Sequence, residues 1–248
     1  MRARPAPATD RPAFYALAPG GWRDLVTLLH PPYTAWHLSY VAIGAAMAPV
    51  FHGARLAAAL AAFFLAVGVA AHALDELTGR PLRTRLSDRA LIALAVAGLA
   101  GAVAIGIYGA ATISATLVPF TAAGVFLVLA YDLEWFAGRF HSDTWFAIAW
   151  GAFPAATGYW VQGLEVRPEG VAAVLACLAL SVAQRRLSSP VRELRRRTVS
   201  LTGEQHLRDG RVIALDAARV AAPLDGALRA CALAVTLLAV ALVVARLR

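Results

Sequence analysis

Long apolar stretches alternate with shorter polar segments along most of this chain. Seven of the apolar stretches are close to the roughly 20 residues that a helix needs to cross the hydrocarbon core of a bilayer. They lie at 33–51, 55–74, 90–109, 112–131, 144–163, 169–186 and 227–245. The pattern predicts an all-α fold, a polytopic transmembrane helix bundle of about seven spans.

Small residues are frequent within these stretches, for example at Gly98, Gly101, Gly106 and Gly109. Apolar bulk alone does not drive helices together in lipid, whereas small residues let helix backbones approach closely. We therefore expect one bundled domain and not a string of isolated anchors.

The polar segments suggest how the rest of the chain is organised. Residues 1–20 are rich in Pro and Ala, which predicts a disordered cytoplasmic tail, and the helical spacing within 21–30 predicts an interfacial helix. The predicted units are 1–30 for tail and interfacial helix, 31–186 for six spans, 187–226 for a basic cytoplasmic connector, and 227–248 for the final span. The connector could be solvated and held to anionic lipid, or it could lie on the membrane as amphipathic helices around 192–197 and 212–224 and gate the substrate.

Composition agrees with a membrane protein. Hydrophobic residues make up 60% of the chain and charged residues 15%, where a soluble domain carries roughly a quarter charged residues. All 23 basic residues are arginine, and they lie between the apolar stretches. The formal charge of +8 therefore indicates an anionic membrane surface as partner, and no nucleic acid. The two cysteines lie inside apolar stretches, which supports neither a disulfide framework nor a CxxC metal site.

The arginines also predict an orientation. With seven spans, nineteen arginines fall on the side that holds the N-terminus and the loops 75–89, 132–143 and 187–226, and four fall on the other side. Because positive residues collect on the cytoplasmic side, we expect a cytoplasmic N-terminus in an integral protein of a prokaryotic inner or plasma membrane.

The first cluster of candidate chemistry closes the second span. His72, Asp75 and Glu76 have the spacing i, i+3 and i+4, so a continuous helix places them on one face. Carboxylates there could hold Mg²⁺, while Arg80 and Arg83 could bind phosphate oxygens in fork geometry. The alternative is a helix end closed by an ion pair between Glu76 and Arg80.

A second cluster follows the fourth span. Tyr131 and Glu134 lie about one turn apart, and Arg139 and His141 follow in a short loop. With His72 and the carboxylates, His141 offers a mixed nitrogen and oxygen ligand set on the same side of the membrane. Asp143, directly before an apolar stretch, is typical of a helix N-cap.

Two features lie within spans. His37 is either a functional ionisable group or, more simply, a hydrogen-bonded core histidine. The fifth span contains Trp150, Gly151, Pro154 and Gly158, which predicts a kinked helix that could line a cavity.

Taken in order, these features resemble the UbiA-type intramembrane prenyltransferase superfamily. The stretch HALDELTGRPL at 72–82 is similar to the family's acidic motif after the second helix, with the arginine–proline step behind it. The loop that begins at Tyr131 is similar to the family's tyrosine-containing polar loop, and 153–160 to its proline and glycine–tryptophan helix. The resemblance covers about residues 30–165.

The resemblance implies an integral membrane enzyme that acts on an isoprenyl diphosphate at the cytoplasmic face with Mg²⁺. It implies catalytic roles for Asp75, Glu76, Tyr131 and Glu134, metal binding by Asp75 and Glu76, and substrate binding by His72, Arg80, Arg83, Arg139 and His141. The family has a second aspartate-rich motif after its sixth helix, and this chain reads AQRRLSSPVRELRRR there. Its arginines, among them Arg186 or Arg192, could bind a diphosphate directly.

Two alternatives stay open. His72, Asp75, Glu76, Glu134 and His141 could instead bind a transition metal, because mixed imidazole and carboxylate ligands suit iron, manganese or zinc. The chain could also be a non-catalytic lipid-binding protein that keeps the fold. In each case the expected partners are the bilayer and an isoprenoid or another lipid.

Overall fold

The first long helix begins where the sequence places two consecutive prolines. The computed structural model describes residues 11–248, and in it α2 (Pro31–Met47) starts at Pro31. Proline is favoured at this position because its ring presets the helical φ and the first helical N–H has no partner in the helix. A short helix, α1 (Trp22–Leu28), precedes it where the interfacial helix is predicted.

The described chain is mostly helical. After α2 follow, in chain order, α3 (Gly53–Phe63), the π-helix η2 (Phe64–Ala71), α4 (His72–Leu77), α5 (Asp88–Thr112), α6 (Leu117–Asp132), α7 (Trp135–Gly138), α8 (Asp143–Ala147), the π-helix η3 (Ile148–Ala152), α9 (Phe153–Gly163), α10 (Pro168–Arg196), β1 (Gly203–His206), β2 (Val212–Leu215) and α11 (Ala217–Arg246). Each predicted apolar stretch overlaps a helix or a continuous helical run, although 48–51 and 113–116 lie outside the helices.

Within residues 11–248, four helical runs are long and apolar enough to cross a membrane. They are Gly53–Leu77, Asp88–Thr112, Pro168–Arg196 and Ala217–Arg246, and α6 is a shorter apolar helix. The expected predominantly helical fold is thus confirmed, and four helical runs are long and apolar enough to be among the expected spans. Large apolar side chains on the outside, such as Val96 and Ile107 on α5 and Leu233 and Leu237 on α11, suit a membrane environment.

Glycines bring the helices into close contact, as the small-residue pattern predicts. A Cβ at Gly44 of α2 would lie 2.0 Å from the carbonyl oxygen of Ala155 in α9. A Cβ at Gly158 of α9 would lie 2.1 Å from the carbonyl oxygen of Val41. Since no side chain fits at either position, α2 and α9 pack backbone against backbone. Gly98 of α5 approaches the backbone of η2 in a similar way.

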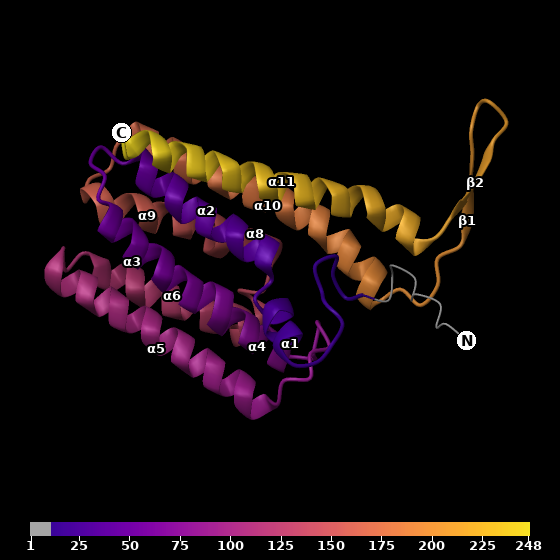
Figure 1. The fold of residues 1–248 in the computed structure, drawn as a ribbon, viewed down its shortest axis with the longest axis horizontal. Coiled ribbons are helices and arrows are strands. Elements are labelled where there is room, and N and C mark those ends of the chain that lie inside the picture. The colour runs from indigo at the N-terminus through magenta and orange to yellow at the C-terminus, as the bar shows by residue number, and fades with distance from the viewer. Residues whose placement is uncertain (1–10) are drawn as a thin grey trace.

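The segment expected to be a connector is largely helical. Figure 1 shows α10 and α11 side by side along the whole bundle, with the antiparallel hairpin β1–β2 projecting from one end. Leu187 and Val191 extend α10 because they join the same hydrophobic core as Leu224 and Leu228 of α11. The prediction of an amphipathic helix over 212–224 is wrong in its first part, since Val212–Leu215 pairs as strand β2 and α11 begins only at Ala217.

The two ends of the bundle differ in their polar contacts. At the end that carries the C-terminus, Arg55 donates to the carbonyl oxygens of Val161 and Gln162, and Arg246 donates to those of Ala48 and Pro49. These bonds satisfy carbonyls at a helix end and in a loop. The other end is the one where α4, α1 and the hairpin lie, and we refer to it as the α4 end.

Candidate functional site

A polar cavity of about 290 Å³ lies at the α4 end of the bundle. Residues from eight helical elements and from the segment before α1 line it, so the fold brings together positions far apart in the sequence. We call this space the polar cavity. Its charged and titratable lining residues are Tyr15, His30, Tyr33, His37, His72, Asp75, Tyr131, Asp132, His141, Arg185, Arg192, Arg196, Arg197 and Asp225.

The basic wall of the polar cavity comes from α10. Arg185, Arg192 and Arg196 recur at i, i+7 and i+11, which places them on one helical face. The Nε of Arg185 donates to Asp143 over 2.5 Å, and its guanidinium lies 5.1 Å from the centre of the Phe146 ring. Arg192 donates to the hydroxyl of Ser189 over 3.2 Å. Arg192 is thus a cation with a neutral partner, which leaves it able to bind an anion.

Three aspartates face this wall. Asp75 comes from α4, Asp132 from the last residue of α6, and Asp225 from α11. Asp225 forms a buried ion pair with Arg195, but its Oδ1 has no hydrogen-bond partner within the described protein. The Oδ2 of Asp132 is likewise buried without a partner. Because an unpaired buried carboxylate oxygen is costly, these atoms point to a ligand or cation that completes the site.

Histidines form the inner part of the cavity. The rings of His30 and His72 stack with their centres 3.9 Å apart, and His72 Nδ1 lies 3.2 Å from the carbonyl oxygen of Gly68. The buried Nε2 of His30 has no hydrogen-bond partner among residues 11–248. Burial lowers the pKa of His30 well below its usual value, and the neighbouring His72 lowers it further. His37 lies deeper, and its Nε2 is 3.2 Å from the side-chain oxygen of Gln184, as for a hydrogen-bonded core histidine.

His30 also carries backbone strain. Its φ is 46° and its ψ 55°, in the left-handed region that is uncommon for residues other than glycine, although Asn, Asp and His adopt it more often than the rest. The residue sits directly before α2, so this conformation turns the chain from α1 into the bundle. Strained positions of this kind cluster at ligand sites, where the surrounding structure holds them.

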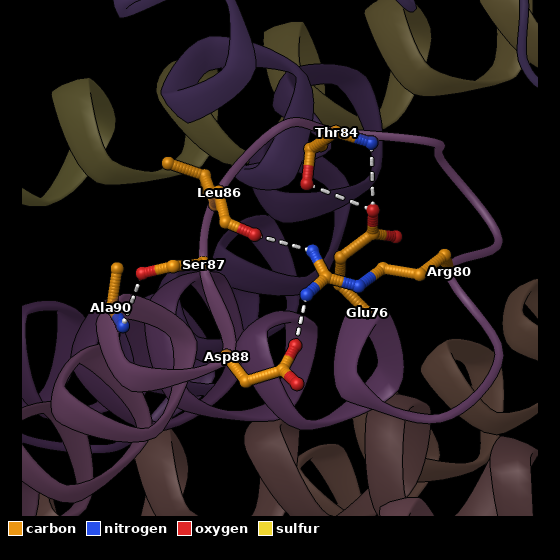
Figure 2. A network of polar contacts seen from close by, with 7 residues as sticks. All are labelled: Glu76, Arg80, Thr84, Leu86, Ser87, Asp88 and Ala90. Atoms are coloured by element: carbon orange, nitrogen blue, oxygen red, sulfur yellow. Dashed lines mark hydrogen bonds and ion pairs between the residues drawn. The ribbon is translucent and has the colours of Figure 1, made fainter.

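Glu76 has a different role from its neighbour Asp75. Its side chain is fully buried, and Figure 2 shows it beside the loop that joins α4 to α5. Oε2 accepts from the backbone N–H of Leu82 over 2.9 Å, and Oε1 accepts from both the N–H and the hydroxyl of Thr84 over 2.8 Å each. Consecutive helical residues point about 100° apart, so Asp75 lines the cavity while Glu76 holds the loop.

Arg80 belongs to the same loop (Figure 2). Its guanidinium donates to the carbonyl oxygen of Leu86 over 2.5 Å and pairs with Asp88 in the first turn of α5. The structure does not form the ion pair between Glu76 and Arg80 that the sequence offers as the alternative. Glu76 instead accepts from Leu82 and Thr84, and Arg80 binds Leu86 and Asp88. Arg83 is exposed.

The structure thus brings together only part of the predicted site. His72, Asp75, Tyr131 and His141 line the polar cavity, and the ring of His141 stacks on that of Tyr131 at 4.4 Å. Five predicted residues, all among those the structure describes, do not line it: Glu76, Arg80, Arg83, Glu134 and Arg139. Glu134 and Arg139 are exposed in the turn around α7.

Helix α8 begins one residue earlier than the sequence predicts. The N-cap is Ser142, whose hydroxyl accepts from the N–H of Trp145, and Asp143 instead binds Arg185. This contact ties α8 to the basic wall of α10.

The segment before α1 forms part of the wall of the polar cavity. Residues 12–15 line the cavity, and the Tyr15 ring lies 5.3 Å from that of His30 and 5.5 Å from that of Tyr33. The carbonyl oxygen of Pro12 accepts from Arg196 over 3.5 Å. The predicted disorder of the tail is therefore wrong for residues 11–20, while residues 1–10 lie outside the described part of the chain.

An apolar cavity of about 240 Å³ adjoins the polar one. It lies between α3, η2, α5, α6 and α9, and Ala58, Ala62 and Ala66 leave space along one face of the α3–η2 run. Val67 and Trp150 line both cavities. Val67 belongs to η2 and Trp150 to η3, so a π-helical turn stands on each side of the junction. Such turns are frequent at functional sites.

No group of three or more His, Cys, Asp or Glu side chains in residues 11–248 is arranged to hold a metal ion by itself. The transition-metal set of His72, Asp75, Glu76, Glu134 and His141 is accordingly not assembled.

Sequence reasoning missed several residues of the polar cavity, among them Tyr15, Tyr33, Asp132 and Asp225. Asp132 has a detectable signal, since it is an ionisable residue at the end of an otherwise apolar helix. Tyr15 has none, because the segment around it shows no periodic pattern. Comparison of the chain with protein-family models, with curated proteins and with solved structures found no match.

Proposed function

We propose that this protein is an integral membrane enzyme of the intramembrane prenyltransferase type, acting on an isoprenyl diphosphate. The observation that carries the proposal is the junction at Val67 and Trp150, where an arginine-lined polar cavity meets an apolar cavity inside the bundle. An amphiphile with an anionic head and a hydrocarbon chain fits both spaces at once.

The arginines of α10 support a substrate whose head group carries phosphate. Guanidinium groups bind phosphate oxygens in a planar, bidentate geometry, and they bind more strongly where water is excluded. Arg192 and Arg196 face the cavity with a hydroxyl and a backbone carbonyl as their hydrogen-bond acceptors. A diphosphate would replace these neutral acceptors with charged ones.

The length of the apolar cavity supports a substrate with a long hydrocarbon chain. Its lining runs along α3–η2 from Ala54 to Val67, which at 1.5 Å per residue corresponds to roughly 20 Å. In prenyl transfer the allylic C–O bond breaks with its electron pair leaving on the diphosphate, and the acceptor bonds to the carbon and loses a proton. A dry chamber protects the electron-poor carbon from water.

Magnesium fits the carboxylates that face the polar cavity. Mg²⁺ commonly uses one or two protein carboxylates together with substrate phosphates and water, so it needs no complete protein cage. Asp75 and the unpartnered Oδ2 of Asp132 are the groups that would hold it. Bound there, the ion would neutralise charge on the diphosphate as it leaves. Glu76 is not part of this proposed set, because the loop uses both of its oxygens.

The proposed membrane arrangement has seven spans with the α4 end in the cytoplasm. Besides the four long apolar helices, α2, α6 and the α8–η3–α9 run would cross the bilayer within the bundle. The nineteen-to-four distribution of arginines supports this orientation. The order of the acidic motif, the tyrosine loop and the proline helix supports membership of the UbiA-type superfamily.

A binding and release assay tests the proposal. Purified protein in lipid nanodiscs is titrated with labelled farnesyl diphosphate, and Mg²⁺-dependent release of diphosphate is followed with aromatic and isoprenoid acceptors. Arg192→Ala should weaken binding roughly 10- to 100-fold, the loss typical of a hydrogen bond to a charged group. The control Arg83→Ala, at an exposed arginine outside the cavity, should bind as the wild type does.

The outcomes separate the candidate functions. Binding that depends on Arg192 together with Mg²⁺-dependent release supports the enzyme. Binding without release under any acceptor condition supports the non-catalytic lipid-binding protein. Failure of the wild type to bind, or equal binding by the Arg192 variant, overturns the proposed head-group site.

A further inference from the structure

Only one of the two ring nitrogens of His37 has a hydrogen-bond partner. His37 lies on α2, is buried, and lines the polar cavity. Its Nε2 lies 3.2 Å from the side-chain oxygen of Gln184 on α10. Its Nδ1 is buried as well and has no hydrogen-bond partner among residues 11–248. Because a buried polar atom without a partner is costly, a structural role on α10 accounts for only half of this side chain.

The bond to Gln184 determines which nitrogen of His37 carries the hydrogen. An amide oxygen can only accept a hydrogen bond, so Nε2 is the protonated nitrogen that donates to it. In a neutral imidazole the other nitrogen then keeps its lone pair. The Nδ1 of His37 is therefore a nitrogen that can take up a proton, held in place by the contact on the opposite side of the ring.

His37 stands next to the junction of the two cavities. Its ring centre lies 6.4 Å from that of Trp150 and 5.9 Å from that of Phe146. Trp150 lines both cavities. A diphosphate in the polar cavity and a hydrocarbon chain in the apolar cavity would place the allylic C–O bond between them, at this junction. The acceptor has to reach the same carbon, so it would give up its proton close to His37.

The other histidines of the polar cavity are placed differently. His30 and His72 stack on each other with their ring centres 3.9 Å apart. His141 stacks on Tyr131, and its Nδ1 lies 3.0 Å from the carbonyl oxygen of the same residue. Among the histidines that the structure describes, ring contact with the tryptophan at the junction thus distinguishes His37.

We propose that the acceptor binds in the inner part of the polar cavity beside Trp150, and that Nδ1 of His37 takes its proton. The allylic C–O bond breaks with its electron pair on the diphosphate. The reacting atom of the acceptor bonds to the allylic carbon, and the hydrogen of that atom moves as a proton to Nδ1. His37 becomes an imidazolium whose Nε2–H still donates to Gln184, and it returns the proton to water when the products leave.

This assignment rests on the proposed function and specifies the second substrate. The acceptor is a molecule whose reacting carbon, oxygen or nitrogen carries a hydrogen that it gives up on transfer. Gln184 is a positioning residue, because it acts only through the tautomer and the orientation of His37.

Binding and transfer measured on the same variants test the role of His37. His37→Gln keeps a polar side chain that cannot take up a proton at neutral pH. In nanodiscs with Mg²⁺, it should bind labelled farnesyl diphosphate as the wild type does. Single-turnover transfer to phenol, naphthol or geraniol as probe acceptors should slow about 100-fold or more, the usual contribution of a general base. The control His52→Gln, at an exposed histidine before α3, should change neither quantity.

Chemical rescue distinguishes proton transfer from packing. His37→Ala leaves a space that a small ring can fill. Imidazole and pyrazole are nearly equal in size, but pyrazole is a far weaker base. Imidazole in the buffer should therefore restore transfer by His37→Ala, and pyrazole should not. Equal rescue by both rings would show that the histidine ring only fills space, and it would overturn the assignment.

The positioning role of Gln184 has its own pair of variants. Gln184→Leu removes the acceptor of the Nε2–H and should slow transfer roughly 10-fold or more, as loss of such an orienting contact does. Gln184→Glu keeps an oxygen acceptor and should retain most of the rate. The control Gln205→Leu lies on the exposed hairpin and should have no effect. Equal rates in Gln184→Leu and the wild type would overturn the positioning role.

A measurement on the unsubstituted protein tests the tautomer without any transfer assay. Nitrogen NMR of protein with isotope-labelled histidine, in nanodiscs at neutral pH, should show His37 with a protonated Nε2 and an unprotonated Nδ1. Coupling to a labelled Gln184 side chain identifies the signals. A hydrogen on Nδ1 would overturn the assignment even where transfer is observed.

The outcomes separate the two proposals. Transfer by the wild type that is lost in His37→Gln and rescued by imidazole supports the assignment. Transfer that persists in His37→Gln overturns the role of His37 and leaves the proposed function standing. A wild type that binds no farnesyl diphosphate, or transfers it to none of the probe acceptors, overturns the proposed enzyme and the role of His37 with it.

Discussion

Thr84 donates two hydrogen bonds to one oxygen of Glu76, through its backbone N–H and its hydroxyl, each 2.8 Å long. The other carboxylate oxygen of Glu76 accepts from the N–H of Leu82. A fully buried carboxylate thereby fixes the loop between α4 and α5, whose Arg80 and Arg83 adopt positive φ angles. Asp75 and Glu76, which look like a metal site in the sequence, therefore have different roles. Asp75 lines the polar cavity, and Glu76 holds the loop.

Glu76→Gln should therefore destabilise the protein without a direct effect on ligand binding. The amide would turn one acceptor into a donor that faces backbone N–H groups, at a cost of about 1–3 kcal/mol. Unfolding followed in detergent by circular dichroism measures the loss, and the control Glu134→Gln, at an exposed position, should change little. A Glu76→Gln variant that is fully stable but binds no Mg²⁺–diphosphate would contradict the structural role.

Asp132→Asn should lower Mg²⁺-dependent diphosphate release without lowering stability, the reverse of the result expected for Glu76→Gln. The Oδ2 of Asp132 is buried without a partner, so loss of the charge should leave stability unchanged or raise it. If Asp132 helps to hold Mg²⁺, Mg²⁺-dependent diphosphate release should fall by ~10-fold or more. The control Asp209→Asn changes an exposed carboxylate of the hairpin, which is paired with Arg211, and should affect neither quantity. Normal release by the Asp132 variant would remove this residue from the proposed metal set.

The helices could be predicted from the sequence because apolar length is a strong signal. The start of α2 at Pro31 follows from where proline is tolerated. The end of α10 and the start of α11 could not be predicted, because polar residues continue both helices beyond the apolar stretch. Contacts between α10 and α11, such as the buried ion pair between Arg195 and Asp225, stabilise these helix ends.

The site could be predicted where its residues lie close together along one helix or in the loop that follows it, as His72 lies near Asp75 and His141 near Tyr131. His72 and Asp75 share a face and do line the polar cavity. The resemblance suggests Arg192 as a group that could bind a diphosphate, and Arg192 does line the cavity, whereas Arg185 and Arg196 could be assigned to it only once α10 had been placed. Asp132 was overlooked beside Tyr131, although a carboxylate at the end of an apolar helix is itself a signal.

The Tyr15 side chain should control access to the polar cavity from the α4 end. Burial raises the pKa of Tyr15 well above its usual value, so the phenol stays neutral and packs on His30 and Tyr33. Tyr15→Ala should speed exchange of labelled inorganic diphosphate roughly 2- to 10-fold, the effect of losing aromatic pairs. Trp22→Ala removes an exposed aromatic ring of α1 and serves as the control. Unchanged exchange in Tyr15→Ala would show that the segment does not close the cavity.

His30 should make the folded protein sensitive to mild acid. Burial, and next the neighbouring His72, lower the pKa of His30 below its usual value near 6.5. The unfolded chain therefore binds a proton that the folded chain resists, so the free energy of unfolding should fall as the pH drops below about 6.5. The groups that face His30 are Tyr15, Tyr33 and His72, with Arg192 and Arg196 further along the cavity.

A substitution at His30 separates its titration from that of other groups. Asn suits the left-handed backbone of this position, so His30→Asn should keep the fold and lose part of the acid sensitivity. Thermal unfolding in detergent at pH 7.5 and 5.5 measures the difference, with His206→Asn on the exposed hairpin as the control. Equal acid sensitivity of the His30 variant and the wild type would place the titrating group elsewhere.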